Sequence, residues 1–449
     1  MKQLVTTLSL LIVLGSFGFL SAGQKSPNFI LILTDDQSYV GTSFLANPED
    51  SRTRSDYYQT PNMERLADMG MRFTNGYSPA PYCCPTRRSI TIGQTPAKHE
   101  YQADRENWPK VYRKQLSIPR MLRAANPDYR SAHFGKWDHR YDDVTPAEMG
   151  YDVSDGYTDN GTGGGKQSEW PKAMDDPKLI FSLSERGCNF MEQQVKEGKP
   201  FYLQVSHYAV HLGITYTQES LDKYKQLDGD GRHFIPEFAA MTEDLDTGIG
   251  ILLDKVEELG ISDNTYIIFM SDNGGRNSQP IGPQQKVARN FPLRDGKGSM
   301  YEGGIRVPFV FIGPGVKKNS FSHVPVTGLD ILPTLADLSG YNKKLPEIID
   351  GGNIAPVAKN KGRGTVKRQR PFLVFHHAVD RKAQSAIREG RYKLVKTWKD
   401  NQLELFDLEK DVGEENDLSA KLPAVVRDLD DKLVAFLKEV KAETRRTED

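Results

Sequence analysis

Three features are scarce in this sequence: cysteine, net charge and long hydrophobic runs. Cys83, Cys84 and Cys188 are the only cysteines among 449 residues, which excludes a disulfide-stapled extracellular module. The formal net charge is −1, from 59 basic and 60 acidic residues, so no overall positive field attracts nucleic acid or an anionic membrane. An anionic substrate therefore has to be held by a local basic pocket.

The one long apolar stretch lies at the N-terminus and indicates export. Lys2 precedes an apolar segment over residues 8–20, and Ser21-Ala22-Gly23 supplies small residues for cleavage. The pattern predicts a signal peptide at residues 1–23 and a periplasmic or secreted protein with no membrane attachment after cleavage. A retained anchor is the alternative, disfavoured because the stretch is short for a spanning helix. An odd number of cysteines in an exported protein leaves one thiol that needs an explanation.

Short apolar runs and helical patterns alternate along the chain. Continuous apolar runs suit strands that are buried on both faces of a parallel sheet. They cover residues 28–34, 200–206, 265–271 and 307–313, with helical patterns at 114–125 and 240–258. The alternation predicts an α/β fold with a large, mainly parallel sheet flanked by helices.

A change in composition predicts a second, smaller subdomain. Residues 351–370 are rich in Gly, Lys and Arg and poor in apolar residues. Short strand-like segments follow, and then a helical pattern; they lie at 372–376, 385–388, 391–397 and 422–441. We therefore predict a catalytic α/β domain at 24–360 and a C-terminal α+β subdomain with a small antiparallel sheet and a helix at 361–449.

Oxygen-bearing side chains follow two of the predicted strands directly. Asp35 and Asp36 come after the run 28–34, and Asp272 and Asn273 come after the run 265–271. In an open parallel sheet, ligands bind outside the carboxyl ends of the strands. Four oxygen donors suit Ca²⁺ or Mg²⁺, and no thiolate or imidazole cluster indicates zinc. The alternative is that these side chains only cap turns or helices.

The segment Cys83-Cys84-Pro85-Thr86-Arg87 carries the most specific signal. By itself, a cysteine here is a metal ligand, a nucleophile or a buried thiol. The segment resembles the Cys-x-Pro-x-Arg motif of the formylglycine-dependent (type I) sulfatase family, whose cysteine is oxidised to formylglycine. Conversion of Cys83 would explain the odd cysteine count. The family usually has Ser or Ala where this chain has Thr86.

The resemblance extends over nearly the whole mature chain, with the motifs in the family's order. The other segments that resemble family motifs are Asn28–Gln37, Gly135-Lys136-Trp137, Ser206–His211, Ser271–Gly275, Gly296-Lys297-Gly298, Tyr301–Pro308, Asp330–Thr334, Arg388–Leu394 and Leu405–Leu408. The resemblance implies an alkaline-phosphatase-like fold and a sulfuric ester hydrolase.

The resemblance also implies a division of roles. Asp35, Asp36, Asp272 and Asn273, with the modified Cys83, would hold Ca²⁺, with Mg²⁺ as the alternative. A hydrated aldehyde at residue 83 supplies one hydroxyl that attacks sulfur and a second that lets the covalent sulfate leave. The remaining catalytic roles fall to Arg87, which would orient the hydrate, Lys136 and Lys297, which would hold sulfate oxygens, and His211, the general acid.

One position departs from the family pattern. The family usually has His directly after Gly-Lys-Trp, whereas this chain has Asp138 there and His139 one place later. We predict that His139 is the base for sulfate release, since a loop can absorb one residue; the alternative is an exposed loop residue. Asp138, Arg140 and His376 are the predicted substrate contacts. His376 is preferred to His377, which would point to the opposite face of a strand.

These inferences converge on an exported sulfatase that acts on a sulfated carbohydrate. The expected partners are a sulfated oligosaccharide or polysaccharide and a formylglycine-generating or radical maturation enzyme, with no nucleic acid and no membrane. An algal polysaccharide such as ulvan or carrageenan is favoured over glycosaminoglycan fragments. Two alternatives stay open: a phosphonate monoester or phosphodiester hydrolase on the same fold, and a non-catalytic carbohydrate-binding relative, which only the Asp138 departure supports.

Overall fold

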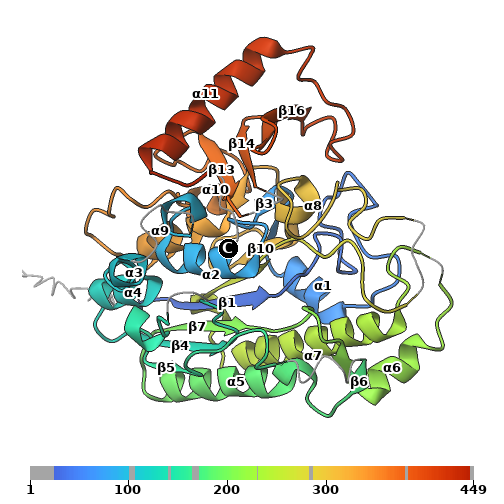
Figure 1. Cartoon of the computed structure of the whole chain (residues 1–449). Helices are drawn as coiled ribbons and strands as arrows, with labels where there is room; N and C mark the ends of the chain where they lie inside the picture. Colours follow the sequence, from blue (N-terminus) through green and yellow to red (C-terminus); the bar gives the residue numbers. More distant parts are fainter. Residues whose placement is uncertain are drawn as a thin grey trace, which may run out of the picture.

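The computed structural model describes residues 25–100, 107–139, 143–163, 171–229, 231–282, 287–379 and 383–444. Its centre is an eight-stranded sheet in the order β11-β2-β10-β9-β1-β7-β4-β5 (Figure 1). The strands that run parallel are β9 (Thr265–Ser271), β1 (Asn28–Thr34), β7 (Phe201–Ser206), β4 (Arg130–Gly135) and β5 (Val153–Ser154). The predicted α/β class is confirmed. The predicted signal peptide at residues 1–23 lies outside the described residues.

Strand β1 shows why the sheet has a core on both faces. Its side chains alternate, so that Ile30 and Ile32 pack in one apolar cluster with Leu252 of a helix on that face. Phe29, Leu31 and Leu33 pack in a second cluster, which includes Met121 and Leu335 on the other face. A continuous apolar run is therefore what a doubly covered strand requires.

Helices cover both faces of the sheet, as Figure 1 shows. One face carries α1 (Pro61–Asp68), α5 (Ile180–Lys196), α6 (Gln218–Tyr224) and α7 (Pro236–Glu258). The other carries α2 (Cys83–Ile92), α3 (Trp108–Tyr112), α4 (Ile118–Ala125), α9 (Ile331–Leu338) and α10 (Ala355–Lys359). Helix α4 begins later than the pattern from 114 predicted, because Ser117 caps it by accepting from the Arg120 N–H and Pro119 occupies its first turn. Among the described residues, no helix has the length and hydrophobicity that crossing a membrane requires.

The far edge of the sheet departs from the parallel pattern. Strand β10 (Phe309–Ile312) runs antiparallel to β9 and to β2 (Met71–Phe73), and β11 (Ser320–Ser322) completes the edge. Two small pairs lie outside the sheet, β3 (Gly76–Tyr77) with β12 (Val326–Thr327) and β6 (Lys172–Ala173) with β8 (Thr215–Tyr216). The mainly parallel character predicted for the sheet therefore holds for its centre.

The C-terminal residues form a separate four-stranded antiparallel sheet. Its strands are β13 (Phe372–His377), β14 (Gln384–Glu389), β15 (Tyr392–Thr397) and β16 (Gln402–Asp407). Helix α11 (Pro423–Glu439) packs Leu429 and Leu433 onto Ile387 and Leu394 of one sheet face. In Figure 1 this helix lies across the top of the molecule. The strands and the helix were predicted, except β16; the domain boundary at residue 360 stays a prediction.

A buried charge cluster joins the small sheet to the rest of the chain. The Lys393 ammonium of β15 donates to Glu302 of α8 (Glu302–Ile305) and to Glu414, at 2.8 Å each. Glu302 also accepts hydrogen bonds from Arg306 at 2.6 Å and from the Tyr77 hydroxyl at 2.8 Å. The side chains of Lys393, Glu302 and Glu414 are completely buried. Burial raises the pKa of Glu302, but the charges of Lys393 and Arg306 outweigh it and hold that pKa well below its usual range.

Candidate active site

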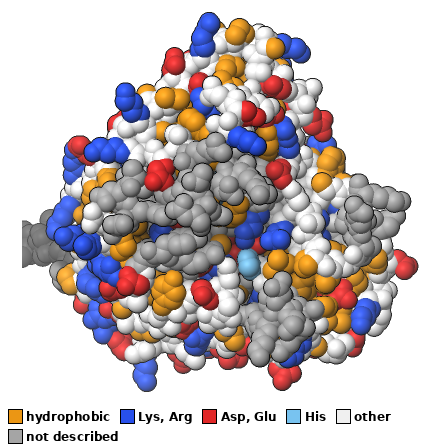
Figure 2. Space-filling view, viewed as in Figure 1, with side chains coloured by type: hydrophobic (Ala, Val, Ile, Leu, Met, Phe, Trp, Pro, Cys, Tyr) orange, Lys and Arg blue, Asp and Glu red, His pale blue; other side chains and the backbone are white. Residues whose placement is uncertain are grey.

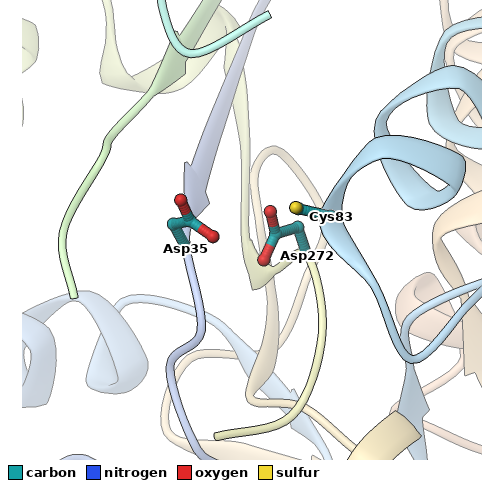
Figure 3. Close-up of side chains that lie close together, drawn as sticks. All are labelled: Asp35, Cys83 and Asp272. Atoms are coloured by element: carbon teal, nitrogen blue, oxygen red, sulfur yellow. The ribbon is translucent and has the colours of Figure 1, made fainter. Parts of the chain in front are cut away.

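The candidate site lies at the carboxyl ends of β1 and β9. These strands pair with Thr34 opposite Ser271, so the next residues, Asp35 and Asp272, emerge side by side. Cys83 is the first residue of α2, and its side chain points toward the two carboxylates (Figure 3). The ligand atoms of Asp35, Cys83 and Asp272 all lie within 4.8 Å of one another, and all three residues are buried.

The oxygen atoms at this place fit a hard cation. Asp35 Oδ1, Asp36 Oδ2 and Asn273 Oδ1 are buried and have no hydrogen-bond partner among the described residues. Asp36 adopts a left-handed backbone (φ 59°), which aspartate tolerates, and its N–H donates to Asp272 Oδ1 at 3.2 Å. Buried oxygens without partners are costly unless a ligand satisfies them, and a set of carboxylate and amide oxygens suits Ca²⁺. The structure thus brings together the ligands that the sequence predicted.

Two lysines approach the same carboxylates. Lys136 Nζ lies 2.6 Å from Asp35 Oδ2, and Lys297 Nζ forms an ion pair with Asp36 Oδ1. Burial lowers the pKa of Lys136, but the Asp35 charge outweighs it and keeps that pKa well above its usual value, so Lys136 stays a cation. Gly135 must precede it, because a Cβ there would lie 2.1 Å from the Ser206 carbonyl oxygen. Lys and Arg side chains gather beside a histidine near the middle of the face in Figure 2.

Arg87 lies one helical turn after Cys83, which explains the spacing of the motif. Its guanidinium donates through Nε to Asp272 Oδ2 at 2.9 Å and through Nη1 to the Lys136 carbonyl at 2.6 Å, and its Nη2 lies 2.6 Å from Asp272 Oδ2. Arg87 therefore holds the Asp272 carboxylate and the main chain at Lys136 in place.

The Cys83 thiol is a poor nucleophile in this setting. Burial raises its pKa to about 11, although the charges of Lys136 and Lys297 act to lower it. At neutral pH the side chain is therefore a neutral thiol. The position at the centre of the site does not suit chemistry by an unmodified cysteine.

His211 lies at the rim of the site and is 17% exposed at its side chain. Its Nδ1 is 2.9 Å from the Leu212 carbonyl oxygen, which can only accept, so Nδ1 carries a proton. Nε2 is 3.9 Å from Asp36 Oδ2 and faces the carboxylates. Burial lowers the pKa of His211. The geometry therefore directs the Nε2 atom toward the carboxylates of the site.

Asp138 and His139 point in different directions. The substrate contact at Asp138 stays a prediction, whereas the role predicted for His139 needs correction. The Asp138 carboxylate lies 3.5 Å from Lys136 Nζ, and its backbone is left-handed (φ 52°). This turn directs the next ring away: His139 is fully buried and stacks on Trp137 with ring centroids 3.7 Å apart. Among the described residues, the His139 ring forms no hydrogen bond or ion pair with the carboxylates and lysines of the site. The base role predicted for His139 is therefore not supported, and the exposed-loop alternative is also wrong.

The prediction for His376 is also wrong. His376 is fully buried, and its ring nitrogens bond Ser385 Oγ and the Glu443 carbonyl, both at 2.7 Å. Its neighbour His377, on the opposite face of β13, lies against Tyr82, the residue before Cys83, with ring centroids 4.7 Å apart. His377 is thus the histidine that reaches the catalytic part of the chain. Arg140, another predicted contact, lies outside the described residues.

The sequence analysis missed Lys178. This lysine is 1% exposed, has a left-handed backbone (φ 55°) and donates to the Leu212 carbonyl oxygen at 2.9 Å. The same oxygen accepts from His211, so the two residues share an anchor. Burial lowers the pKa of Lys178 to about 8. No motif surrounds Lys178 in the sequence, so no signal was available to find it.

Known proteins share this sequence pattern and fold. The family model described as Sulfatase matches residues 27–341, and a second one, described as N-sulphoglucosamine sulphohydrolase, C-terminal, matches residues 295–442. A sulfatase of Formosa agariphila is 28% identical, over 90% of this chain and 86% of its own length. An ulvan-active sulfatase of the same organism is 26% identical, over 92% of this chain and 81% of its own.

A solved structure shows the likeness in three dimensions. The protein Ps i-CgsB, in complex with k-i-k-neocarrahexaose, has a TM-score of 0.75 and 25% identity, and the match covers 92% of this chain and 93% of that one. With the family model matched over most of the chain and its motif residues gathered in one site, the chain belongs to the sulfatase family, whose members hydrolyse sulfate esters.

Proposed function

We propose that this chain is an exported, Ca²⁺-dependent sulfatase that hydrolyses a sulfate ester of a carbohydrate, using a formylglycine made from Cys83. The observation that carries the proposal is the meeting of Asp35, Cys83 and Asp272 within 4.8 Å, with two lysines against the carboxylates. An ulvan-active relative and a structural neighbour in complex with k-i-k-neocarrahexaose support a sulfated carbohydrate as the substrate. The signal-peptide pattern at residues 1–23 supports export.

We assign the following roles to the residues of the site. When present, the hydrated formylglycine supplies the nucleophile and its second hydroxyl, and Ca²⁺ on the four oxygen ligands supplies a Lewis acid. Lys136 and Lys297 hold the anionic sulfate oxygens and stabilise the charge that develops on them. Nε2 of protonated His211 donates a proton to the departing sugar oxygen. Arg87 keeps Asp272 and the Lys136 main chain in place.

Sulfate release from a panel of sulfated oligosaccharides tests the proposal directly. The protein is co-expressed with a formylglycine-generating enzyme and assayed with Ca²⁺, beside phosphate mono- and diesters and phosphonate esters of matched alcohols. We expect release from at least one sulfated saccharide, with a higher kcat/KM than for the matched phosphorus esters. A preference for the phosphodiester or phosphonate would establish the alternative hydrolase. If protein that carries the aldehyde at residue 83 binds the saccharide but releases no sulfate, the chain is a non-catalytic carbohydrate-binding relative.

Removal of the metal is expected to destabilise the site and stop turnover. Without a cation, the buried oxygens Asp35 Oδ1, Asp36 Oδ2 and Asn273 Oδ1 have no hydrogen-bond partner among the described residues. Ca²⁺ at 100 times its Kd would raise the free energy of unfolding by about 2.7 kcal/mol. Protein dialysed against chelator should therefore show a lower Tm and no sulfate release, and Ca²⁺ should restore both better than Mg²⁺. An unchanged Tm and rate after dialysis would contradict the assignment.

A further inference from the structure

Lys178 is a buried lysine that none of the roles assigned above uses. Burial lowers its pKa, while the charges of Asp35 and Asp36 act to raise it, so its ammonium lies near the proposed metal ligands. Lysine is almost never fully buried unless its ammonium has a partner. Here the ammonium donates to the Leu212 carbonyl oxygen at 2.9 Å. The bond connects a buried cation to one main-chain oxygen at the edge of the site.

The Leu212 carbonyl belongs to the peptide that precedes a glycine. Gly213 has a φ of 40°, in the left-handed region, and glycine visits this region and others at little cost. The direction of the Leu212 carbonyl is therefore weakly fixed by the local chain. The hydrogen bond from Lys178 supplies a constraint that the glycine does not.

The same carbonyl oxygen orients the ring of His211. Nδ1 of His211 lies 2.9 Å from it, and a carbonyl oxygen has two lone pairs, so it accepts from the ring and from the lysine together. The main chain before the ring is held separately, since the Val210 N–H donates to the Asp35 carbonyl oxygen at 2.6 Å. With Nδ1–H engaged, Nε2 faces Asp36 Oδ2 at 3.9 Å. The direction of Nε2 therefore depends on the oxygen that Lys178 holds.

The main chain at Lys178 is itself in an uncommon conformation. Lys178 and Leu179 are both left-handed, each with a φ of 55°, which costs free energy in residues other than glycine and persists where the surroundings hold it. Strand β6, before Lys178, pairs with β8, after Leu212, and the short turn Pro177–Leu179 also contacts β8. The segment that carries the lysine is thus held beside the segment that carries the carbonyl.

We propose that Lys178 is a positioning residue for the general acid: by holding the Leu212 carbonyl, it fixes the His211 ring so that Nε2 can protonate the departing sugar oxygen. The inference rests on the proposed function and adds a residue to its protonation step. As the bond between sulfur and the sugar oxygen breaks, that oxygen takes the electron pair and the Nε2 proton. Loss of the Lys178 ammonium leaves Lys136 and Lys297 in place, so kcat should fall while KM changes little.

A double-mutant cycle on Lys178 and His211 tests the inference, with kcat and KM for the best saccharide of the panel as readouts. Lys178→Met should lower kcat by about 10- to 100-fold, the scale of a misplaced catalytic group, and leave KM within about threefold. In a His211→Gln background the same substitution should lower kcat no further, because no ring is left to position. Lys396→Met removes another buried lysine, bonded to Asp430 at 2.8 Å, and should leave kcat unchanged. An unchanged kcat in Lys178→Met, or losses that multiply in the double variant, overturns the inference.

The ring itself can be observed without turnover, by NMR of isotope-labelled histidine in Cys83→Ala protein. The signal that His211→Gln removes identifies His211. We expect the neutral ring to carry its proton on Nδ1, and to become a mixture of the two tautomers when Lys178→Met is added; an unchanged ring overturns the inference.

Two further outcomes are separated by these measurements. If Lys178→Met does not fold, Lys178→Gln replaces it in both experiments. If His211→Gln keeps the full rate, the inference fails together with the general acid. If no saccharide is turned over by any variant, the proposed function fails, and the NMR measurement alone decides whether Lys178 holds the ring.

Discussion

Replacing Cys83 by alanine is expected to abolish sulfate release, lowering kcat by about 10⁴-fold or more, the scale seen when an enzyme loses its nucleophile. The residue lies at the centre of the site, where its side chain meets both Asp35 and Asp272. Burial raises the pKa of the thiol to about 11, which disfavours a thiolate nucleophile and agrees with the proposed modification of this residue. Initial rates of sulfate release with the best saccharide of the panel measure the effect.

The neighbouring cysteine offers a matched control. Cys84 is also buried at the start of α2, and Cys84→Ala changes the helix by the same number of atoms. We expect this variant to keep its turnover, and the mass of the peptide that contains residue 83 to show an aldehyde in it. If Cys83→Ala retains a rate within tenfold of the unmutated protein, the nucleophile lies elsewhere and the proposed mechanism is wrong.

The second large effect concerns stability. Lys393→Met is expected to lower the free energy of unfolding by about 3–5 kcal/mol, because it leaves two buried carboxylates, Glu302 and Glu414, without their shared cation. Burial already raises the pKa of Glu414, and loss of the ammonium removes the charge that opposes this shift. Urea denaturation monitored by tryptophan fluorescence measures the change.

A surface lysine provides the comparison for that experiment. Lys432 of α11 pairs with Asp428 and Glu389 but is 34% exposed, and such pairs contribute at most about 1 kcal/mol. Lys432→Met should therefore change stability little, and Lys393→Met with Glu414→Gln should recover part of the loss. Equal losses for the two lysine variants would show that the buried cluster contributes no more than a surface pair.

The sequence was sufficient to predict the centre of the fold and the meeting of the acidic side chains at the site. Strand β1 is apolar on both faces because both are covered, and this leaves a continuous run that is easy to recognise. Asp35 and Asp272 follow directly from strands that are neighbours in a parallel sheet, so their meeting needs no further information. The spacing of Cys83 and Arg87 is likewise a local property of one helical turn.

The predictions that proved wrong concern side chains whose direction depends on the backbone or the packing at a single position. The left-handed backbone of Asp138 sends its carboxylate to Lys136 and its successor His139 into an aromatic cluster, and no sequence pattern reports that torsion. Alternation along β13 showed that His376 and His377 face opposite ways. It did not show which face meets the rest of the chain, because that depends on how the small sheet packs against the large one.

The buried cluster around Glu302 has a consequence for protein engineering. Glu302 begins the short helix α8, five residues after Lys297, and its partner Lys393 belongs to the C-terminal sheet. Another residue of that sheet, Arg388, bonds the Tyr77 hydroxyl, which also donates to Glu302. The small sheet is thus not an interchangeable module. A chimera that takes its C-terminal sheet from a relative must import Lys393 and Arg388 together, or Glu302 loses one of its two buried cationic partners and the Tyr77 hydroxyl loses its guanidinium partner, close to the Lys297 loop.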